Sequence, residues 1–456
     1  MKQNTQYDKK DASSIERFAL RLVDKSLRGL IEKGEVAPSL IKDNQVGKGG
    51  FGVALEKYYF KIQPGNESRP DFPEAHVELK TTPLKRTGTG LWSKERLVLN
   101  IINFMDIVGE KWETSSFLRK NSLLLLVFYL HEKGVAVIDL LVKLAGLWEY
   151  PAQDKEIIRQ DWNNIVKKIK EGKAHEISEG DTYYLGACTK GANRKSKRQQ
   201  PFSKILAKQR AFAFKQRYVN YIIRALLERQ KFHIADTGRI IKDASELKAK
   251  TFDDVVIGRF KPYLGLTTLQ IAKKLGIVIK LKAKNYNDII TRGILKVDRS
   301  KIEEFEKAEV IVKSIVLEKG GGLKESISFP YFKYKELIKE KDWDNSGLKQ
   351  MFEKRFFFVV YRKGNKGERT LVKVMFWNMP YNDLDRHVQS VWKKTKKRVI
   401  QGKYNELPKI SDNPVAHVRP HGRNAKDVCE TPDGKTATKK CFWLNAKYIR
   451  EQIGRI

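Results

Sequence analysis

The sequence has few cysteines and no apolar run long enough to cross a membrane. Its three cysteines, Cys188, Cys429 and Cys441, lie too far apart for a disulfide framework or a zinc site, whose ligands come in close pairs. The longest apolar run, residues 123–130, has the length of a buried strand, and residues 1–14 lack the apolar core of a signal peptide. These absences predict a protein of the reducing cytoplasm that has no membrane partner.

Acidic residues are scarce relative to basic ones. Asp and Glu number 54 against 90 Lys and Arg, so the formal net charge is 90 − 54 = +36, and both halves of the chain share the excess. A cationic surface of this size attracts the phosphate backbone and releases counterions on binding, which predicts affinity for nucleic acid without sequence choice. A lysine-rich surface that is only solvated is the alternative explanation.

The sequence repeats itself at long range. The segment KWETSSFLRKNSLLLLVFYLHEKG, which contains Trp112, resembles DWDNSGLKQMFEKRFFFVVYRKG, which contains Trp343, with an offset of 343 − 112 = 231. Two further pairs of segments keep nearly the same offset in the same order. Since 456 residues with 41% hydrophobic content can bury more than one core, the repeat predicts two copies of one fold. We expect the copies at residues 1–232 and 251–456, joined by a linker at 233–250.

Local patterns indicate a mixed α/β protein. Apolar residues recur at helical spacing over residues 14–33, and residues 202–229 are also predicted to form a long helix. Residues 58–62 and 75–80 have the composition of strands on either side of a polar turn. Residues 121–130 include a continuous apolar run, which is typical of a central strand covered on both faces. Each copy is therefore expected to contain a mixed β-sheet flanked by helices.

The segment RPDFPEAHVELKTTPL carries the residues best suited to chemistry. Glu78 and Lys80 are two apart, so in a strand they project from the same face, and Asp71 precedes them by seven residues and can lie beside them. Carboxylate oxygens hold Mg²⁺, and a neighbouring lysine can orient or help to deprotonate an attacking water. This pattern predicts phosphodiester hydrolysis. A salt-bridged surface strand is the alternative, because Glu-x-Lys arises by chance in a lysine-rich chain.

Two further residues can reach the same pocket. Glu56 follows the glycine turn KGGFG and offers a third carboxylate, and Lys120 immediately precedes the predicted central strand. The turn itself lacks the spacing of a nucleotide-binding loop, so no ATP site is predicted, but Lys48 within it is a candidate contact to the DNA backbone.

These motifs carry a family resemblance. KGGFGVALE, DFPEAHVELKTTPL and SSFLRK followed by an apolar strand resemble the successive motifs of the MutH endonuclease family, a branch of the PD-(D/E)XK nucleases. The doubled chain is similar to the Sau-three-A type of restriction enzyme, in which a catalytic MutH-like domain is followed by a degenerate one. The resemblance implies two tandem restriction-endonuclease-like domains and a GATC target in double-stranded DNA.

The same resemblance implies a role for each residue of the first copy. Asp71 and Glu78 would bind the metal, Lys80 would serve the water, Glu56 would support the metal site, and Lys120 would lie near the scissile phosphate. The second copy lacks this equipment. Aligning Leu84 with Leu317 places Lys313 on Lys80 but Ile311 on Glu78. The alignment at the glycine turn of the first copy places Arg292 on Glu56. Isoleucine and arginine cannot hold a metal, so only the first copy is expected to cut.

The second copy carries the better candidate for reading bases. HVRPHGRNAKD, residues 417–427, resembles the base-reading loop of the family and contains Arg419 and Arg423. Arginine can form a bidentate contact with guanine in the major groove. In the first copy Thr189 or Lys190 stands where the arginine would be. A loop that contacts only phosphate, or that is merely solvated, is the alternative.

Together these features predict a Mg²⁺-dependent type II restriction endonuclease that cuts at GATC, with a second domain that binds another GATC copy as effector. A mismatch-repair nicking enzyme of the MutH type is one alternative, against which the duplication argues. A non-catalytic DNA-binding protein is the other, against which the first triad argues. A cognate methyltransferase is expected as a system partner without direct contact, and both a monomer and a DNA-induced dimer stay open.

Overall fold

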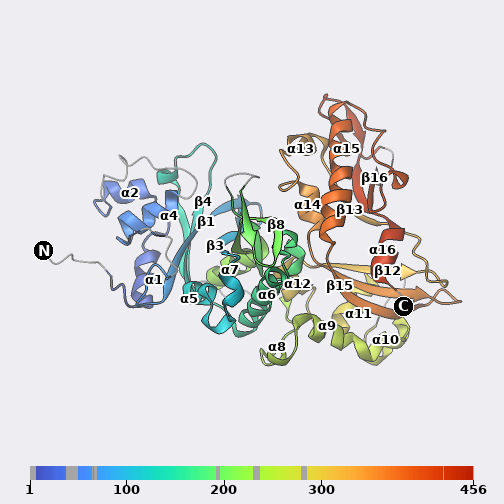
Figure 1. Cartoon of the computed structure of the whole chain (residues 1–456), viewed down its shortest axis with the longest axis horizontal. Helices are drawn as coiled ribbons and strands as arrows, with labels where there is room; N and C mark the ends of the chain where they lie inside the picture. The colour runs from blue at the N-terminus through green and yellow to red at the C-terminus, as the bar shows by residue number, and fades with distance from the viewer. Residues whose placement is uncertain are drawn as a thin grey trace.

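A computed structural model provides the fold of the chain, in which the first half and the second half lie at opposite ends of an elongated molecule (Figure 1). No helix in its described part is long and apolar enough to span a membrane. Lys48, a predicted DNA contact, lies outside the described residues. The structure describes residues 7–36, 50–63, 65, 69–191, 196–229, 237–278, 285–424 and 426–454.

The first half is built on a mixed sheet with strand order β2-β1-β4-β5. The bounds are β1 (Val77–Thr87), β2 (Gly90–Ser93), β4 (Leu123–Leu130) and β5 (Val142–Glu149). Strand β4 runs parallel to β1 and antiparallel to β5. Its residues are buried on both faces, because Leu125 and Val127 pack in one core and Leu124 and Leu126 in another. The prediction of a central strand here is confirmed.

Helices cover both faces of this sheet. The core that contains Leu125 includes residues of α1 (Ala12–Leu20), α2 (Leu27–Glu32) and α4 (Gly50–Ala54). The core that contains Leu124 includes residues of α6 (Ala152–Lys170) and α7 (Gln216–Glu228). A second sheet of order β3-β9-β6 and a ribbon of β7 and β8 complete the half. Their bounds are β3 (Leu97–Ile101), β6 (Leu185–Thr189), β7 (Lys197–Gln200), β8 (Ser203–Lys208) and β9 (Arg210–Phe214).

The second half has the strand topology of the first without a counterpart of β2 in its described residues. One sheet has the order β12-β14-β15, with β12 parallel to β14 and β15 antiparallel to it, and the other has the order β13-β19-β16. The strands are β12 (Ile311–Leu317), β13 (Ile327–Tyr331), β14 (Phe356–Lys363), β15 (Arg369–Trp377), β16 (Ala416–Pro420) and β19 (Lys440–Leu444). The α/β class is therefore as predicted, and this shared topology supports the proposal that the chain is duplicated.

The helices of the second half also follow the order of the first. Helices α14, α15 and α16 occupy the places in sequence that α5, α6 and α7 occupy in the first half, relative to the strands. Helices α9, α10, α11 and α12 come before β12, the first strand of the main sheet of the second half. Their bounds are α5 (Ser116–Asn121), α9 (Phe252–Phe260), α10 (Thr268–Leu275), α11 (Tyr286–Ile294), α12 (Glu303–Ala308), α13 (Tyr334–Lys339), α14 (Gly347–Phe352), α15 (Gln389–Ile400) and α16 (Ala446–Ile453).

Three local predictions are wrong. Residues 14–33 form two helices, α1 and α2, because the chain turns at Asp24 (φ 62°), whose backbone N–H donates to the carbonyl of Val142. Residues 58–62 are not a strand, since the π-helix η1 (Leu55–Tyr59) reaches into them. The predicted helix at 202–229 begins as strands β8 and β9, and only its last part is helical.

Residues 237–250, the described part of the segment between the two halves, are packed rather than free. Ile240, Ile241 and Leu247 are buried, and Leu247 lies in α8 (Glu246–Ala249). The Gln160 side chain donates from Nε2 to the Leu247 carbonyl oxygen (3.2 Å) and accepts at Oε1 from the backbone N–H of Phe252 (2.9 Å). The connection is therefore fixed to α6.

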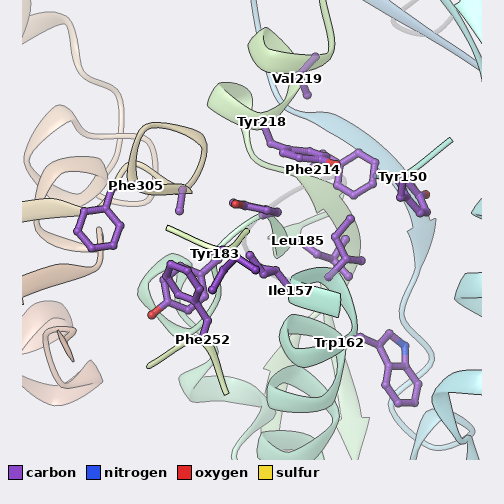
Figure 2. Close-up of a cluster of buried hydrophobic side chains, with 14 of the residues drawn as sticks. Tyr150, Ile157, Trp162, Tyr183, Leu185, Phe214, Tyr218, Val219, Phe252 and Phe305 are labelled. Atoms are coloured by element: carbon purple, nitrogen blue, oxygen red, sulfur yellow. The ribbon is translucent and has the colours of Figure 1, made fainter. Parts of the chain in front are cut away.

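One core extends across both halves. Figure 2 shows Phe252 and Phe305 of the second half close to the aromatic residues around Tyr183 in the first. The ring centroids of Tyr183 and Phe252 are 4.8 Å apart, and those of Phe252 and Phe305 are 6.3 Å apart, both edge-on. Such aromatic pairs add to the stabilisation from area burial. The halves therefore share apolar surface that neither could bury alone.

A buried ionic cluster lies at the same junction. Lys307 of α12, with a side chain 2% exposed, pairs with Asp154 of α6 (2.8 Å) and with Glu303 (2.8 Å). Arg239 pairs with Glu303 (2.9 Å), and the Lys307 ammonium lies 3.6 Å from the ring centroid of Tyr221. Each charge has a partner, as buried charges require.

Replacing Lys307 alone is expected to destabilise the chain strongly. Lys307→Met leaves Asp154 buried without its cation, which costs about 3–5 kcal/mol of unfolding free energy. Chemical denaturation followed by circular dichroism measures the loss. The double variant Asp154→Leu/Lys307→Met is the control, and it should recover much of the stability because no charge is left unpaired. A single variant as stable as the wild type would contradict this account.

Candidate active site

Glu78 lies at the start of β1 with its side chain only 2% exposed. Its carboxylate accepts a hydrogen bond from the backbone N–H of Asp71 (3.1 Å) and one from the Lys80 ammonium. The Lys120 ammonium is 3.6 Å from the same carboxylate. A buried carboxylate with two cations beside it is the centre of the candidate site.

Asp71 precedes β1 and is fixed to it from both sides. Its Oδ2 atom accepts from the backbone N–H of Leu79 (3.0 Å), while its own N–H donates to Glu78. These two bonds fold the segment before the strand back onto its first residues. The seven-residue spacing seen in the sequence thus brings the two carboxylates together.

Lys80 and Lys120 reach Glu78 from different elements. Lys80 follows Glu78 by two residues on β1 and projects from the same face, as strand geometry requires. Lys120 lies on the short helix α5, which Ser115 caps by accepting from the Leu118 N–H and which leads directly into β4. Because β4 pairs in parallel with β1, with Val77 opposite Leu123, the end of α5 lies beside the start of β1.

Glu56 approaches the site from the π-helix η1. Burial first, and then the neighbouring Asp71 and Glu78 carboxylates, raise the pKa of Glu56 to about 7 against the opposing effect of Lys80 and Lys120. Burial also raises the pKa of Glu78, while the Lys80 ammonium opposes that shift. The five residues predicted from the sequence therefore share one electrostatic environment.

The donor set suits a hard divalent cation. Asp71, Glu78 and Glu56 supply carboxylate oxygens, the ligands that such ions prefer. A cation would offset the burial and the neighbouring carboxylates that together raise the pKa of Glu56. In the part of the chain that the structure describes, no three such side chains already stand in ligand positions, and Lys80 is bonded to a Glu78 oxygen.

Removing the Glu56 carboxylate is expected to change how stability depends on pH. The pKa of Glu56 is about 7 in the folded chain against the usual 4.5, so the folded state binds more protons between these values. Its free energy of unfolding therefore falls as pH rises through this window. Glu56→Gln removes that loss and should gain about 1–2 kcal/mol relative to wild type at pH 8, since solvent screening weakens the effect at a partly exposed group. Urea unfolding in EDTA at about pH 4 and pH 8 tests this, and parallel pH profiles would contradict it.

The second half has the strand pair that carries the candidate site in the first half, but not the carboxylates. Ile311 lies opposite Phe356 where Glu78 lies opposite Leu124, and Lys313 lies opposite Phe358. Burial lowers the pKa of Lys313, whose ammonium donates to the Ser328 carbonyl oxygen (3.4 Å). Arg292, aligned with Glu56, is paired with Asp288 on α11 (3.0 Å).

The predicted base-reading residues lie away from the carboxylates, on other strands and loops. Arg419 is exposed at the end of β16, and Arg423 is in the following loop, where its backbone N–H donates to Asp427 (3.0 Å). Thr189 ends β6, and the backbone N–H of Lys190 donates to the Gln209 carbonyl oxygen (2.8 Å).

Strand register changes one correspondence between the copies. Arg419 lies opposite Cys441 on β19, and its counterpart opposite Ala211 on β9 is Cys188 rather than Thr189 or Lys190. The reason is that the strand pairs β6–β9 and β16–β19 begin from equivalent buried pairs of residues. Counting along the strands from these pairs gives the residue in one half that corresponds to each residue in the other. Sequence reasoning also missed Trp443, whose indole lies against Arg419.

Comparison with known proteins agrees with this geometry. The family model described as DNA mismatch repair enzyme MutH matches residues 60–161, which include β1, α5 and β4. Type II restriction enzyme Sau3AI of Staphylococcus aureus is 37% identical over 89% of this chain and 92% of its own length. DNA mismatch repair protein MutH of Shewanella amazonensis is 32% identical over 33% of this chain and 65% of its own length, and that of Pasteurella multocida is 28% identical over 35% and 69%.

Fold, site and comparisons together define a site-specific deoxyribonuclease with a MutH-like nuclease domain of the PD-(D/E)XK kind. Nucleases of this kind are generally metal-dependent and act on double-stranded DNA. Within that class, the chain belongs to the family of the type II restriction enzyme Sau3AI, which it matches along nearly its whole length.

Proposed function

We propose that the first half hydrolyses a phosphodiester bond of double-stranded DNA at GATC sites in the presence of Mg²⁺. The observation that carries the proposal is the buried Glu78 carboxylate, held by the Asp71 N–H and flanked by Lys80 and Lys120. Membership of the Sau3AI family supports the reaction class. The GATC target rests on the resemblance of the motifs around Glu78 to those of the MutH family.

Each side chain has a distinct proposed task. Asp71 and Glu78 would hold Mg²⁺, which supplies Lewis acidity and neutralises charge on the phosphate. Lys80 would orient the attacking water and could take up its proton only after losing one of its own, and Lys120 would provide positive charge for the scissile phosphate. Glu56, with a pKa of about 7, supports the site as a carboxylate whose charge depends on the cation beside it.

The second half is proposed to bind DNA without cutting it. It retains the sheet frame but has Ile311 in place of the carboxylate, and it presents Arg419 at an exposed strand end. We propose that it holds a second GATC copy as an effector. Thr189 and Lys190 of the first half, Arg423 of the second and Lys48 are the other proposed DNA contacts, and the domain limits 1–232 and 251–456 are part of the proposal.

Two other functions fit less well. A mismatch-repair nicking enzyme would need only the first half, whereas the likeness to Sau3AI covers 89% of the chain and that to MutH about a third. A non-catalytic DNA-binding protein would not need three carboxylates and two lysines gathered around Glu78. Restriction in the cytoplasm, beside a methyltransferase that protects host sites without contacting this chain, is the setting we propose.

The metal-ligand assignment predicts that Asp71→Ala or Glu78→Ala lowers cleavage at least about a hundredfold while DNA binding persists. The reason is that either change removes an oxygen ligand for the ion that stabilises the transition state. Plasmid cleavage with Mg²⁺ and gel-shift binding measure the two effects. Glu74→Ala is the matched control, because Glu74 is an exposed carboxylate three residues from Asp71 whose ion-pair partner among the described residues is the exposed Lys10. Normal cutting by either ligand variant would refute the assignment.

The effector assignment predicts cooperation between sites. A plasmid with two GATC sites should be cut several-fold faster per site than one with a single site, because a tethered second site has a raised effective concentration. Short GATC duplexes added in solution should stimulate cutting of the single-site plasmid, and sedimentation of the complexes distinguishes a DNA-induced dimer from a monomer. Equal per-site rates and no response to added duplex would exclude an effector role.

A further inference from the structure

Arg419 and Trp443 form a stacked pair on neighbouring strands of the second half. The guanidinium carbon of Arg419 is 3.7 Å from the centroid of the Trp443 ring, closer than every other arginine–aromatic contact between described residues. Over the described ranges, no hydrogen bond or ion pair occupies this guanidinium. The ring therefore covers one face of the planar guanidinium, while the N–H donors along its edge are available to a ligand.

The indole is itself held in place. Trp443 lies on β19, the middle strand of its sheet, between Ser328 on β13 and His417 on β16. The His417 ring is nearly parallel to it, with centroids 6.3 Å apart, and His421 meets it edge-on at 5.4 Å. His417 is only 2% exposed, and its Nδ1 atom is 2.6 Å from Oδ1 of Asn445. The indole therefore offers Arg419 a fixed surface.

The first half shows that the fold does not require this pair. Strand β9 has Ala213 where β19 has Trp443, and β6 has Cys188 where β16 has Arg419. The equivalent three-stranded sheet forms there with small buried residues at both places. The stacked pair occurs in the half without the carboxylates, which indicates a role in binding rather than in folding.

A nearby cation illustrates the contrast. Lys439 lies 4.8 Å from the centroid of the Tyr331 ring, but its ammonium is paired with Asp427 at 2.5 Å. That lysine is already neutralised by the chain, whereas Arg419 keeps its donors for a partner outside it.

We propose that Trp443 is the positioning residue for Arg419, holding the guanidinium flat so that its edge donates to O6 and N7 of a guanine in the major groove. The inference rests on the proposed function, in which Arg419 reads a base. Arginine is the commonest bidentate reader of guanine, and its contact depends on the orientation of a planar group. Stacking fixes that orientation before DNA arrives, so less side-chain freedom is lost on binding.

The test compares the full chain with Arg419→Ala, Trp443→Ala, Trp443→Phe and the double variant Arg419→Ala/Trp443→Ala. Dissociation constants for a GATC duplex and a scrambled duplex are measured in EDTA, and their ratio is the discrimination. Arg419→Ala and Trp443→Ala should each lower discrimination about tenfold, the size of one bidentate contact. Trp443→Phe should keep most of it, because a phenyl ring still stacks. The double variant should lose no more than Arg419→Ala alone.

Circular dichroism of each variant reports whether it is folded, and its affinity for the scrambled duplex reports the mainly electrostatic part of binding. Tyr331→Ala is the matched control, because it removes a ring beneath a cation that is already ion-paired, and its discrimination should stay at the wild-type level. If Arg419→Ala lowers discrimination but Trp443→Ala does not, the inference fails and the proposed reading by Arg419 stands. If neither changes it, the proposed reading fails as well. Losses that add in the double variant, or that affect both duplexes equally, would show a structural role and overturn the inference.

Discussion

The Glu78 carboxylate is almost removed from water, and the geometry around it depends on the parallel pairing of β1 with β4. That pairing sets the end of α5, and with it Lys120, beside the first residues of β1. The chain also folds back at Asp71, whose two hydrogen bonds to the first residues of β1 place it beside Glu78. A buried carboxylate is costly unless partners offset its charge. The two lysines therefore offset the cost of burying Glu78, in addition to the chemical roles proposed for them, and Glu56 adds negative charge that a divalent cation would balance.

The two halves show that the same arrangement of strands can be kept while the carboxylates of the candidate site are absent. Both have a strand pair in parallel followed by an antiparallel strand, and both have a second three-stranded sheet. In the second half, Ile311 and Lys313 occupy the strand positions of Glu78 and Lys80, and the lysine bonds to a backbone carbonyl instead of a carboxylate. The sheet tolerates this exchange because its central strands, β4 and β14, are buried on both faces.

The sequence allowed some of this to be predicted. The apolar run at residues 121–130 identified the central strand, because few other elements bury every side chain. The spacing of Asp71, Glu78 and Lys80 indicated that they meet, since strand periodicity and a short return fix their positions. The predicted helix at 202–229 was wrong because Phe212 and Phe214 alternate with alanines, a period of two that the helical pattern of α7 obscured.

Other features depend on contacts between distant segments. The partners of Lys307 and the stacking of Arg419 on Trp443 follow from the register and docking of elements that are far apart in sequence. Local patterns do not contain that information. The buried positions of Ile240, Ile241 and Leu247 could not be recognised for the same reason, because the segment that contains them is polar in composition.

The packed junction also has an evolutionary consequence. Restriction enzymes could in principle acquire new targets by exchanging one half for that of a relative. Here a recombined chain would have to match Asp154 with Lys307 and fit Phe252 against Tyr183. A half from a relative that differs at these places would leave a buried charge unpaired or an aromatic ring exposed. Under the proposed function, changes of target in this lineage are therefore easier at the exposed ends of β6 and β16 than through exchange of whole halves.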